Sequence, residues 1–221
     1  KITEDIIMDN LNKYIDHTLL KPSATKDDIK KLCADAAKYD FASVCVNPCY
    51  VKLCSELLKD TQVKVCTVIG FPLGANTTKT KVYETELAYD DGCDEFDMVI
   101  NVGALKEGDL SLVSSDISAV VKAAKGKTVK VIIETFYLTD EEKATATRLA
   151  VNAGADFVKT CTGFNEGKAT SHDVKLMFDA AEGKAKIKAS AGIRDLKTAL
   201  ELIDAGAERL GTSAGVAIIE G

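Results

Sequence analysis

Two lysines and one aspartate stand in short apolar segments where a charged side chain is costly to bury. Lys159 lies in Phe-Val-Lys-Thr-Cys-Thr-Gly, Lys188 in Ile-Lys-Ala-Ser-Ala-Gly and Asp97 in Phe-Asp-Met-Val-Ile. A lysine in such a place needs a partner or a chemical task. A neutral amine can attack a carbonyl carbon and form a Schiff base, and a nearby carboxylate can relay protons or pair with the amine. The three residues are therefore candidates for covalent carbonyl chemistry.

A second cation beside such an amine would make it more reactive. Two ammonium groups ~6 Å apart, at an effective dielectric constant of ~20, repel by about 2.8 kcal/mol. This repulsion equals roughly two pKa units and would move a lysine from ~10.4 toward ~8. Alternation along a strand puts Lys188 inside the fold if Ile187 packs outward. The residues alone leave another reading open, in which both lysines are solvated at strand ends or pair with buried carboxylates.

Eight apolar, β-rich segments alternate with helical patterns and could position these residues. The segments begin near Tyr14, Ala42, Lys64, Glu95, Thr128, Asp156, Lys186 and Glu208, at intervals of 22 to 33 residues. Each interval holds one helix and two loops, the length of a βα unit. Helix signals include the segment 23–38 and a capping box formed by Thr139 and Glu142. The pattern predicts an α/β fold, a (β/α)8 TIM barrel with eight helices.

The barrel accounts for most of the 221 residues, so a single domain over residues 1–221 is expected. Residues 1–13 are predicted to form a short additional helix before the first strand. The alternative is an open, doubly wound sheet, which is disfavoured because no Gly-x-Gly-x-x-Gly follows a strand segment. In a barrel the active site lies at the C-terminal ends of the strands, so the candidates are polar residues inside the strands or at those ends, namely Lys159, Lys188 and Asp97.

Small residues follow the last two strand segments. They are Ser190-Ala191-Gly192 and Gly211-Thr212-Ser213-Ala214-Gly215, and the second run opens a short final helix. Backbone N–H groups can approach an anion closely at such places. Phosphate sites near strands seven and eight are common in this fold. The two segments together predict a phosphate-binding site.

Composition and charge exclude several classes of partner. The net charge of -6 argues against nucleic acid as the main partner, because phosphate backbones need a basic surface. Apolar runs are far shorter than the ~20 residues of a membrane helix, and no signal-peptide pattern is present. Seven cysteines without a secretion signal indicate free thiols in a reducing, cytoplasmic setting. The spacing of Cys45, Cys49 and Cys54, with no nearby His, does not predict a metal site.

The segments that carry these candidates closely resemble the 2-deoxyribose-5-phosphate aldolases, a family of class I aldolases with the barrel fold. The resemblance covers nearly the whole chain, through residues 15–22, 43–48, 68–74, 95–101, 157–164, 187–194 and 211–213. It implies the reversible cleavage of 2-deoxy-D-ribose 5-phosphate to D-glyceraldehyde 3-phosphate and acetaldehyde. Lys159 would then form the Schiff base, Lys188 would tune it and Asp97 would relay protons. An iminium serves as the electron sink, so no metal or other cofactor is implied.

The same resemblance implies contacts with a sugar phosphate and an aldehyde. The substrate-binding residues would be Asp16, Cys45, Thr162, Gly163, Gly192, Gly211 and Ser213, with Asp16 and Cys45 at the ends of the first two strands. Cys161, Phe164 and Ala191 depart from residues that are common in the family (Ser, in some relatives Lys, and Gly). A homodimer or a higher homo-oligomer is expected. Three alternatives stay open: an aldolase for another sugar phosphate, an isomerase, and a phosphate-binding barrel without catalysis.

Overall fold

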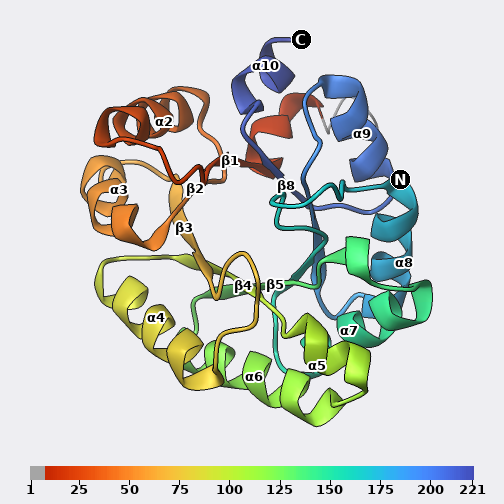
Figure 1. Cartoon of the computed structure of the whole chain (residues 1–221). Coiled ribbons are helices and arrows are strands. Elements are labelled where there is room, and N and C mark those ends of the chain that lie inside the picture. Colours follow the sequence, from red (N-terminus) through yellow and green to blue (C-terminus); the bar gives the residue numbers. More distant parts are fainter. Residues whose placement is uncertain (1–7) are drawn as a thin grey trace.

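Eight parallel strands close into a barrel in the computed structural model, which describes residues 8–221 (Figure 1). The strands are β1 Ile15–Leu19, β2 Ser43–Val46, β3 Lys64–Ile69, β4 Glu95–Val99, β5 Thr128–Ile132, β6 Phe157–Lys159, β7 Lys186–Ser190 and β8 Arg209–Thr212. Neighbours in sequence are hydrogen-bonded to each other, and β8 closes on β1. The predicted TIM barrel is confirmed, and every strand begins within one residue of its predicted start.

Helices surround the barrel on the outside (Figure 1). They are α2 Lys26–Tyr39, α3 Val51–Leu58, α4 Thr78–Asp90, α5 Val102–Glu107, α6 Leu110–Ala123, α7 Asp140–Asn152, α8 Ser171–Ala181, α9 Leu196–Asp204 and α10 Gly215–Glu220. Short 3-10 helices accompany them in the described residues: η1 Leu11–Tyr14, η2 Pro48–Tyr50 and η3 Thr135–Tyr137. None of these helices is long and apolar enough to cross a membrane, as far as the described residues go.

Local sequence signals explain where these helices begin. Thr139 and Glu142 form the predicted capping box at the start of α7. The helix predicted over 23–38 instead begins at Lys26, because Thr25 and Asp28 form a capping box there and satisfy the first free N–H groups. The unit after β4 holds two helices where one was predicted, since Gly108 ends α5 with φ 79° and the Asp109 side chain caps α6.

The additional helix predicted over residues 1–13 lies mostly outside the described residues. From residue 8 onward the chain makes a helical turn and then η1, which leads directly into β1.

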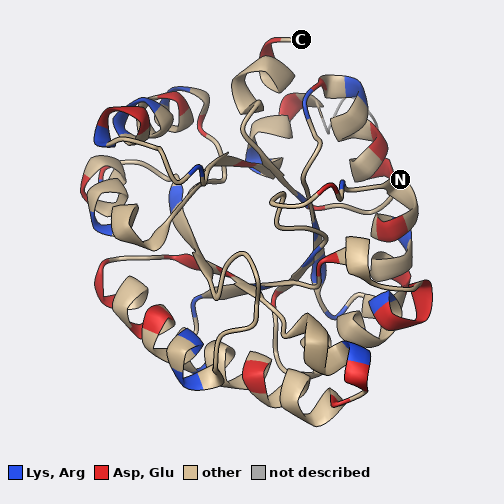
Figure 2. Cartoon of the chain, viewed as in Figure 1, with Lys and Arg blue, Asp and Glu red and all other residues tan. Residues whose placement is uncertain are grey.

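The apolar core lies between the strands and the helices. Val131, Val158 and Ile187 pack outward into this layer and are fully buried. Lys130, Lys159 and Lys188 alternate with these residues along the strands and face the barrel interior. Figure 2 shows charged residues on several of the strands. Because Ile187 packs outward, Lys188 points inward, as its sequence pattern predicted. A small apolar cluster of Leu20, Cys45, Cys66 and Val68 is separate from this core.

Candidate active site

Charged side chains fill the barrel interior, and each has an oppositely charged neighbour. The cations are Lys130, Lys159, Lys188 and Arg209, and the anions are Asp16, Glu95 and Asp97. Glu95 and Arg209 are the first residues of β4 and β8, whereas Lys159 is the last residue of β6. This interior charge network therefore runs from the N-terminal end of the barrel to its C-terminal end.

Asp97 lies at the centre of the network, because three ammonium groups surround its carboxylate. Oδ2 accepts hydrogen bonds from Lys159 Nζ at 2.8 Å and from Lys188 Nζ at 2.7 Å. Oδ1 accepts a hydrogen bond from Lys130 Nζ at 2.9 Å. Lys159 and Lys188 are also paired in the register of β6 and β7. The fold thus brings together the three residues that were predicted to carry the chemistry.

Asp16 contacts Lys188 from another strand. Its Oδ2 lies 2.5 Å from Lys188 Nζ, while its Oδ1 accepts hydrogen bonds from Ser43 Oγ at 2.6 Å and Arg209 Nη1 at 2.7 Å. Asp16 was expected at the end of the first strand, but it is the second residue of β1, because that strand continues to Leu19. It therefore lies deep in the barrel and supports Lys188 from there.

Burial and charge act on these groups in opposite directions. Burial raises the pKa of Asp97, but Lys130, Lys159 and Lys188 outweigh it and hold the pKa well below its usual range. Burial likewise raises the pKa of Asp16, and the nearby cations, Lys188 foremost, bring it below the ordinary value. Burial lowers the pKa of Lys188, yet Asp16 and Asp97 more than compensate and raise it. Lys188 therefore stays protonated and Asp97 stays ionised near neutral pH.

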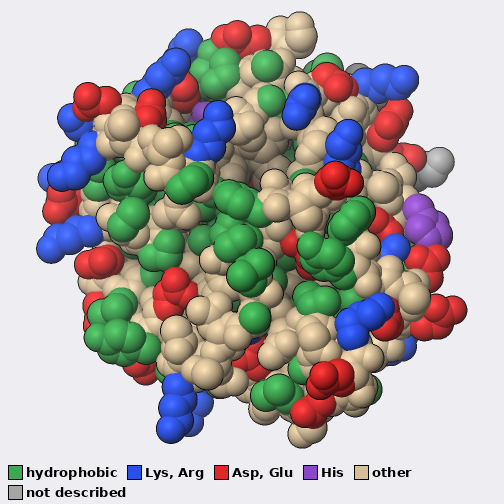
Figure 3. All heavy atoms as spheres, in the orientation of Figure 1, with side chains coloured by type: hydrophobic (Ala, Val, Ile, Leu, Met, Phe, Trp, Pro, Cys, Tyr) green, Lys and Arg blue, Asp and Glu red, His purple; other side chains and the backbone are tan. Residues whose placement is uncertain are grey.

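A cavity of about 550 Å³ opens at the C-terminal face of the barrel. Its walls come from the loops that follow β1, β6, β7 and β8. Within the described part of the chain, Lys159 is the one member of the interior charge network that lines it. Figure 3 shows this face, with a hollow near the upper centre, basic side chains around its upper rim and hydrophobic side chains beside it. A small carbonyl compound can therefore reach the Lys159 amine.

Five of the predicted substrate-binding residues line this cavity: Thr162, Gly163, Gly192, Gly211 and Ser213. A Cβ on Gly211 would lie 3.1 Å from Lys188 Cε, so a side chain there would crowd the amine. Within residues 8–221, the backbone N–H groups of Gly163, Gly192 and Ser213 make no hydrogen bond to the protein. These donors are free for an anion. Asp16 and Cys45 do not line the cavity, because both are fully buried inside the barrel.

Glu134, just after β5, binds Thr162, another of the predicted substrate-binding residues. Its Oε2 accepts hydrogen bonds from Thr162 Oγ1 at 2.5 Å and from Thr162 N–H at 3.2 Å. Glu134 is buried and adopts φ 58°, a left-handed conformation that costs a non-glycine residue about 1–2 kcal/mol. Strain of this kind concentrates at functional sites. Both donors of Thr162 are thus held by a carboxylate.

Comparison with known proteins identifies the family. Residues 11–221 match the model of the DeoC/LacD family of aldolases. The chain belongs to this family. It is 60% identical over 210 residues to deoxyribose-phosphate aldolase 1 of Bacillus licheniformis, covering 95% of this chain and 94% of that protein. It is 57% identical over 211 residues to deoxyribose-phosphate aldolase of Finegoldia magna, covering 96% and 99% of the two chains.

Solved structures show the same barrel. A putative deoxyribose-phosphate aldolase from Coccidioides immitis superposes with a TM-score of 0.94 and 44% identity, covering 96% of this chain and 85% of that chain. The deoxyribose phosphate aldolase of Aeropyrum pernix, described as tetrameric, gives a TM-score of 0.90 at 34% identity, covering 96% and 91%.

In this member of the DeoC/LacD family, three residues expected to differ from those of relatives lie at or near the cavity: Cys161, Phe164 and Ala191. Ala191 adopts φ 78°, the left-handed region where glycine is favoured. Phe164 is half exposed and meets Phe71 edge to face, with ring centroids 5.0 Å apart. Cys161 is buried, its Sγ lies 3.4 Å from Thr135 Oγ1, and burial raises its pKa. None of the three adds a charge to the cavity.

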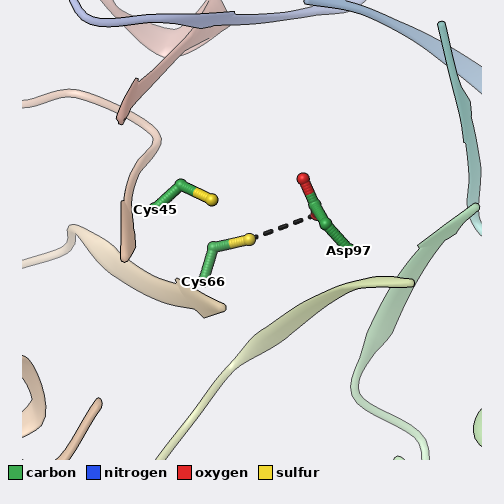
Figure 4. Close-up of side chains that lie close together, drawn as sticks. All are labelled: Cys45, Cys66 and Asp97. Carbon is green, nitrogen blue, oxygen red and sulfur yellow. Dashed lines mark hydrogen bonds between the residues drawn. The ribbon is translucent and has the colours of Figure 1, made fainter. Parts of the chain in front are cut away.

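Two thiols and the central carboxylate lie close enough together to resemble a metal site (Figure 4). The Cys66 thiol donates to Asp97 Oδ1 at 3.2 Å, and Cys45 lies beside Cys66. The electrostatics do not suit a cation, because Asp97 already faces the ammonium groups of Lys130, Lys159 and Lys188. Burial also raises the pKa of Cys66 well above its usual value, which disfavours the thiolate that a metal requires.

Sequence reasoning missed four residues of this site: Glu95, Lys130, Glu134 and Arg209. A signal was present for Lys130, which lies between the apolar residues Val129 and Val131 just as Lys188 lies between Ile187 and Ala189. Alternation alone would have pointed its side chain inward. No comparable signal marks Glu134, because its position depends on a left-handed turn after β5.

Proposed function

We propose that this chain is a deoxyribose-phosphate aldolase that cleaves 2-deoxy-D-ribose 5-phosphate reversibly to D-glyceraldehyde 3-phosphate and acetaldehyde. The observation that carries the proposal is the position of Lys159. Its amine reaches the cavity while it contacts Asp97, and Asp97 in turn binds Lys188. Family membership and the names of the relatives support the same reaction.

The reaction begins when the neutral Lys159 amine attacks the aldehyde carbon of the open-chain sugar. Loss of water gives an iminium, which withdraws electrons from the neighbouring carbon–carbon bond. That bond breaks when the hydroxyl proton on the far carbon leaves, and its electron pair forms an enamine on Lys159. Glyceraldehyde 3-phosphate departs. Protonation of the enamine carbon restores an iminium, and water then releases acetaldehyde and the free amine.

Two proton transfers accompany these bond changes. A proton must leave the substrate hydroxyl, and a proton must later reach the enamine carbon. Lys188 and Asp97 are the groups next to Lys159 that can carry them, with an ordered water as the link to the substrate. Asp16 and Lys130 position these two residues. Asp16 contacts Lys188, and Lys130 contacts Asp97.

The phosphate group fits the loop side of the cavity. The free N–H groups of Gly163, Gly192 and Ser213 provide neutral donors for its oxygens. Thr162 supports the loop through Glu134 in the resting state. Asp16 and Cys45 would influence the sugar only through their neighbours, since neither lines the cavity.

The chain is also proposed to form a homo-oligomer. The support is the Aeropyrum pernix relative, whose structure is described as tetrameric. Size-exclusion chromatography with light scattering checks this directly, and a monomeric mass at micromolar concentration would contradict it.

Trapping with borohydride tests the mechanism. Acetaldehyde and borohydride should leave an ethyl group on Lys159, located by peptide mass mapping. The Lys159→Met variant should fold normally and gain no adduct at that peptide, and the exposed Lys184 serves as an internal control for nonspecific modification. A coupled assay should detect glyceraldehyde 3-phosphate formed from 2-deoxyribose 5-phosphate and none formed from fructose 1,6-bisphosphate. An adduct confined to another lysine would overturn the proposal.

A further inference from the structure

The cavity is basic although the chain as a whole is acidic. Among the described residues, its charged lining consists of Lys21, Lys159, Lys168 and Arg194, with Glu166 as the one anion. Lys159 is paired with Asp97, but within residues 8–221 the side chains of Lys21, Lys168 and Arg194 have no ion-pair or hydrogen-bond partner. Unpaired cations on one concave surface create a local positive potential that attracts anions.

Lys168 has a contact that ties it to one particular part of this surface. A Cβ placed on Gly192 would lie 2.9 Å from Lys168 Cγ and 3.1 Å from both Cβ and Cδ of the same side chain. The missing side chain of Gly192 therefore makes room for the aliphatic part of Lys168. The adjacent Ala169 N–H donates to the carbonyl oxygen of Ala191 at 3.1 Å, which joins the loop after β6 to the loop after β7. Lys168 is thus held beside the free N–H group of Gly192.

We infer that Lys168 is a specificity-determining residue, which binds the phosphate group and makes the enzyme prefer phosphorylated over unphosphorylated sugars. The inference rests on the proposed function. The free N–H groups of Gly163 and Gly192 are neutral donors, and Lys168 supplies a cation beside them. Its charge also offsets Glu166, which lines the same cavity and would repel a phosphate. Phe164, in the same loop, brings no charge.

Kinetics on a matched pair of substrates separates this role from a general structural one. The variants are Lys168→Met and Lys168→Arg, with Lys197→Met as a control because Lys197 is exposed on α9 and does not line the cavity. Lys168→Met should raise KM for 2-deoxyribose 5-phosphate about fivefold to tenfold with kcat unchanged. Lys168→Arg should restore most of the affinity. Activity on unphosphorylated 2-deoxyribose should stay within twofold of the wild type in every variant. Higher salt should reduce the difference in KM for 2-deoxyribose 5-phosphate between the wild type and Lys168→Met.

A second measurement does not depend on turnover. Inorganic phosphate should raise the thermal unfolding temperature of the wild-type protein and of Lys197→Met, and should raise it less for Lys168→Met. If the wild-type protein fails to cleave 2-deoxyribose 5-phosphate, the proposed function fails, while the phosphate shift still tests Lys168. Equal losses on both sugars, or an unchanged KM and an unchanged phosphate shift in Lys168→Met, would overturn the inference.

Discussion

Lys188 lies directly opposite Lys159 in the register of β6 and β7, and both amines donate to the same oxygen atom of Asp97. Repulsion between the two cations is therefore offset by a carboxylate that each of them contacts. The two lysines differ in what else they reach. Lys159 lines the cavity, whereas Lys188 is fully buried and has Asp16 as a second partner. The amine that lines the cavity is the one proposed for covalent chemistry, and the enclosed Lys188 amine is the one proposed for charge and proton handling.

Replacing Lys188 separates these two tasks. Lys188→Met should lower kcat by about 10²–10⁴, the usual contribution of a positioned proton donor or acceptor. It also leaves Asp16 and Asp97 with one cation fewer, so the free energy of unfolding should fall by about 3–5 kcal/mol. Single-turnover kinetics and urea unfolding measure the two effects.

Borohydride trapping of the folded Lys188→Met protein should still modify Lys159. If this variant kept kcat within twofold of the wild type, Lys188 would have no part in proton transfer.

The interior charge network should make stability depend on pH at both extremes. The pKa values of Asp16 and Asp97 are lowered in the folded state, so their contribution is present above the unfolded value of about 3.9 and is lost as pH falls below it. The pKa values of Lys130 and Lys188 are raised, so their contribution is complete below about 10.4 and is lost as pH rises beyond it.

The free energy of unfolding, measured with urea, should therefore be nearly constant from about pH 5 to about pH 9. Asp97→Asn should lower the free energy of unfolding in this range by about 3–5 kcal/mol. The loss of stability below about pH 5 should also become less steep, because a carboxyl group with a lowered pKa has been removed. A sharp stability maximum near neutral pH in the wild-type protein would contradict this account.

Glu134 and Thr162 should be energetically coupled. Their contacts are buried and involve a carboxylate, so a double-mutant cycle with Glu134→Gln and Thr162→Val should give an interaction free energy of about 1.5–3 kcal/mol. Both single variants should also lower kcat/KM, because the loop after β6 begins next to Lys159. Chemical denaturation and steady-state kinetics on the four proteins provide the measurement. Additive effects on stability would show that the contact does not hold the loop.

Ala191 should be a site where glycine improves stability. Its φ of 78° is unfavourable for a residue with a Cβ, and relief of this strain minus the entropy cost of glycine leaves a gain of about 0.5–1 kcal/mol for Ala191→Gly. The matched variant Gly192→Ala should be destabilising, since Gly192 has φ 80° and a Cβ there would meet Lys168. Thermal unfolding of both variants checks the pair. A lower unfolding temperature for Ala191→Gly would contradict the assignment of strain.

The barrel and most of the cavity could be predicted from the sequence because the signals are local. Alternation around Ile187 places Lys188 inside, and the glycines at 154 and 206 end their helices just before β6 and β8. These patterns depend only on neighbouring residues. The same is true of the capping box at Thr139, which fixes the start of α7.

The remaining features depend on contacts between segments that are far apart in the sequence. Asp16 lies near the start of β1 and not at its end, because the strand extends to Leu19. At that position its carboxylate contacts Lys188 and Arg209. The engagement of Thr162 by Glu134 requires a left-handed residue after β5, which no local pattern announces. Spacing predicts which residues face inward, but it does not predict contacts such as those of Asp16 with Arg209 and of Glu134 with Thr162.

The ion pair between Lys159 and Asp97 also bears on how much the protein must rearrange during a turnover. The proposed iminium carries a positive charge on the Lys159 nitrogen, which lies 2.8 Å from Asp97 Oδ2. Asp97, whose pKa stays low, can therefore act as the counterion when that charge forms. Fixed charges that suit successive states need little reorganisation between them. The interior of the barrel can remain rigid throughout the cycle, and adaptation to substrate can be confined to the loops at the cavity mouth.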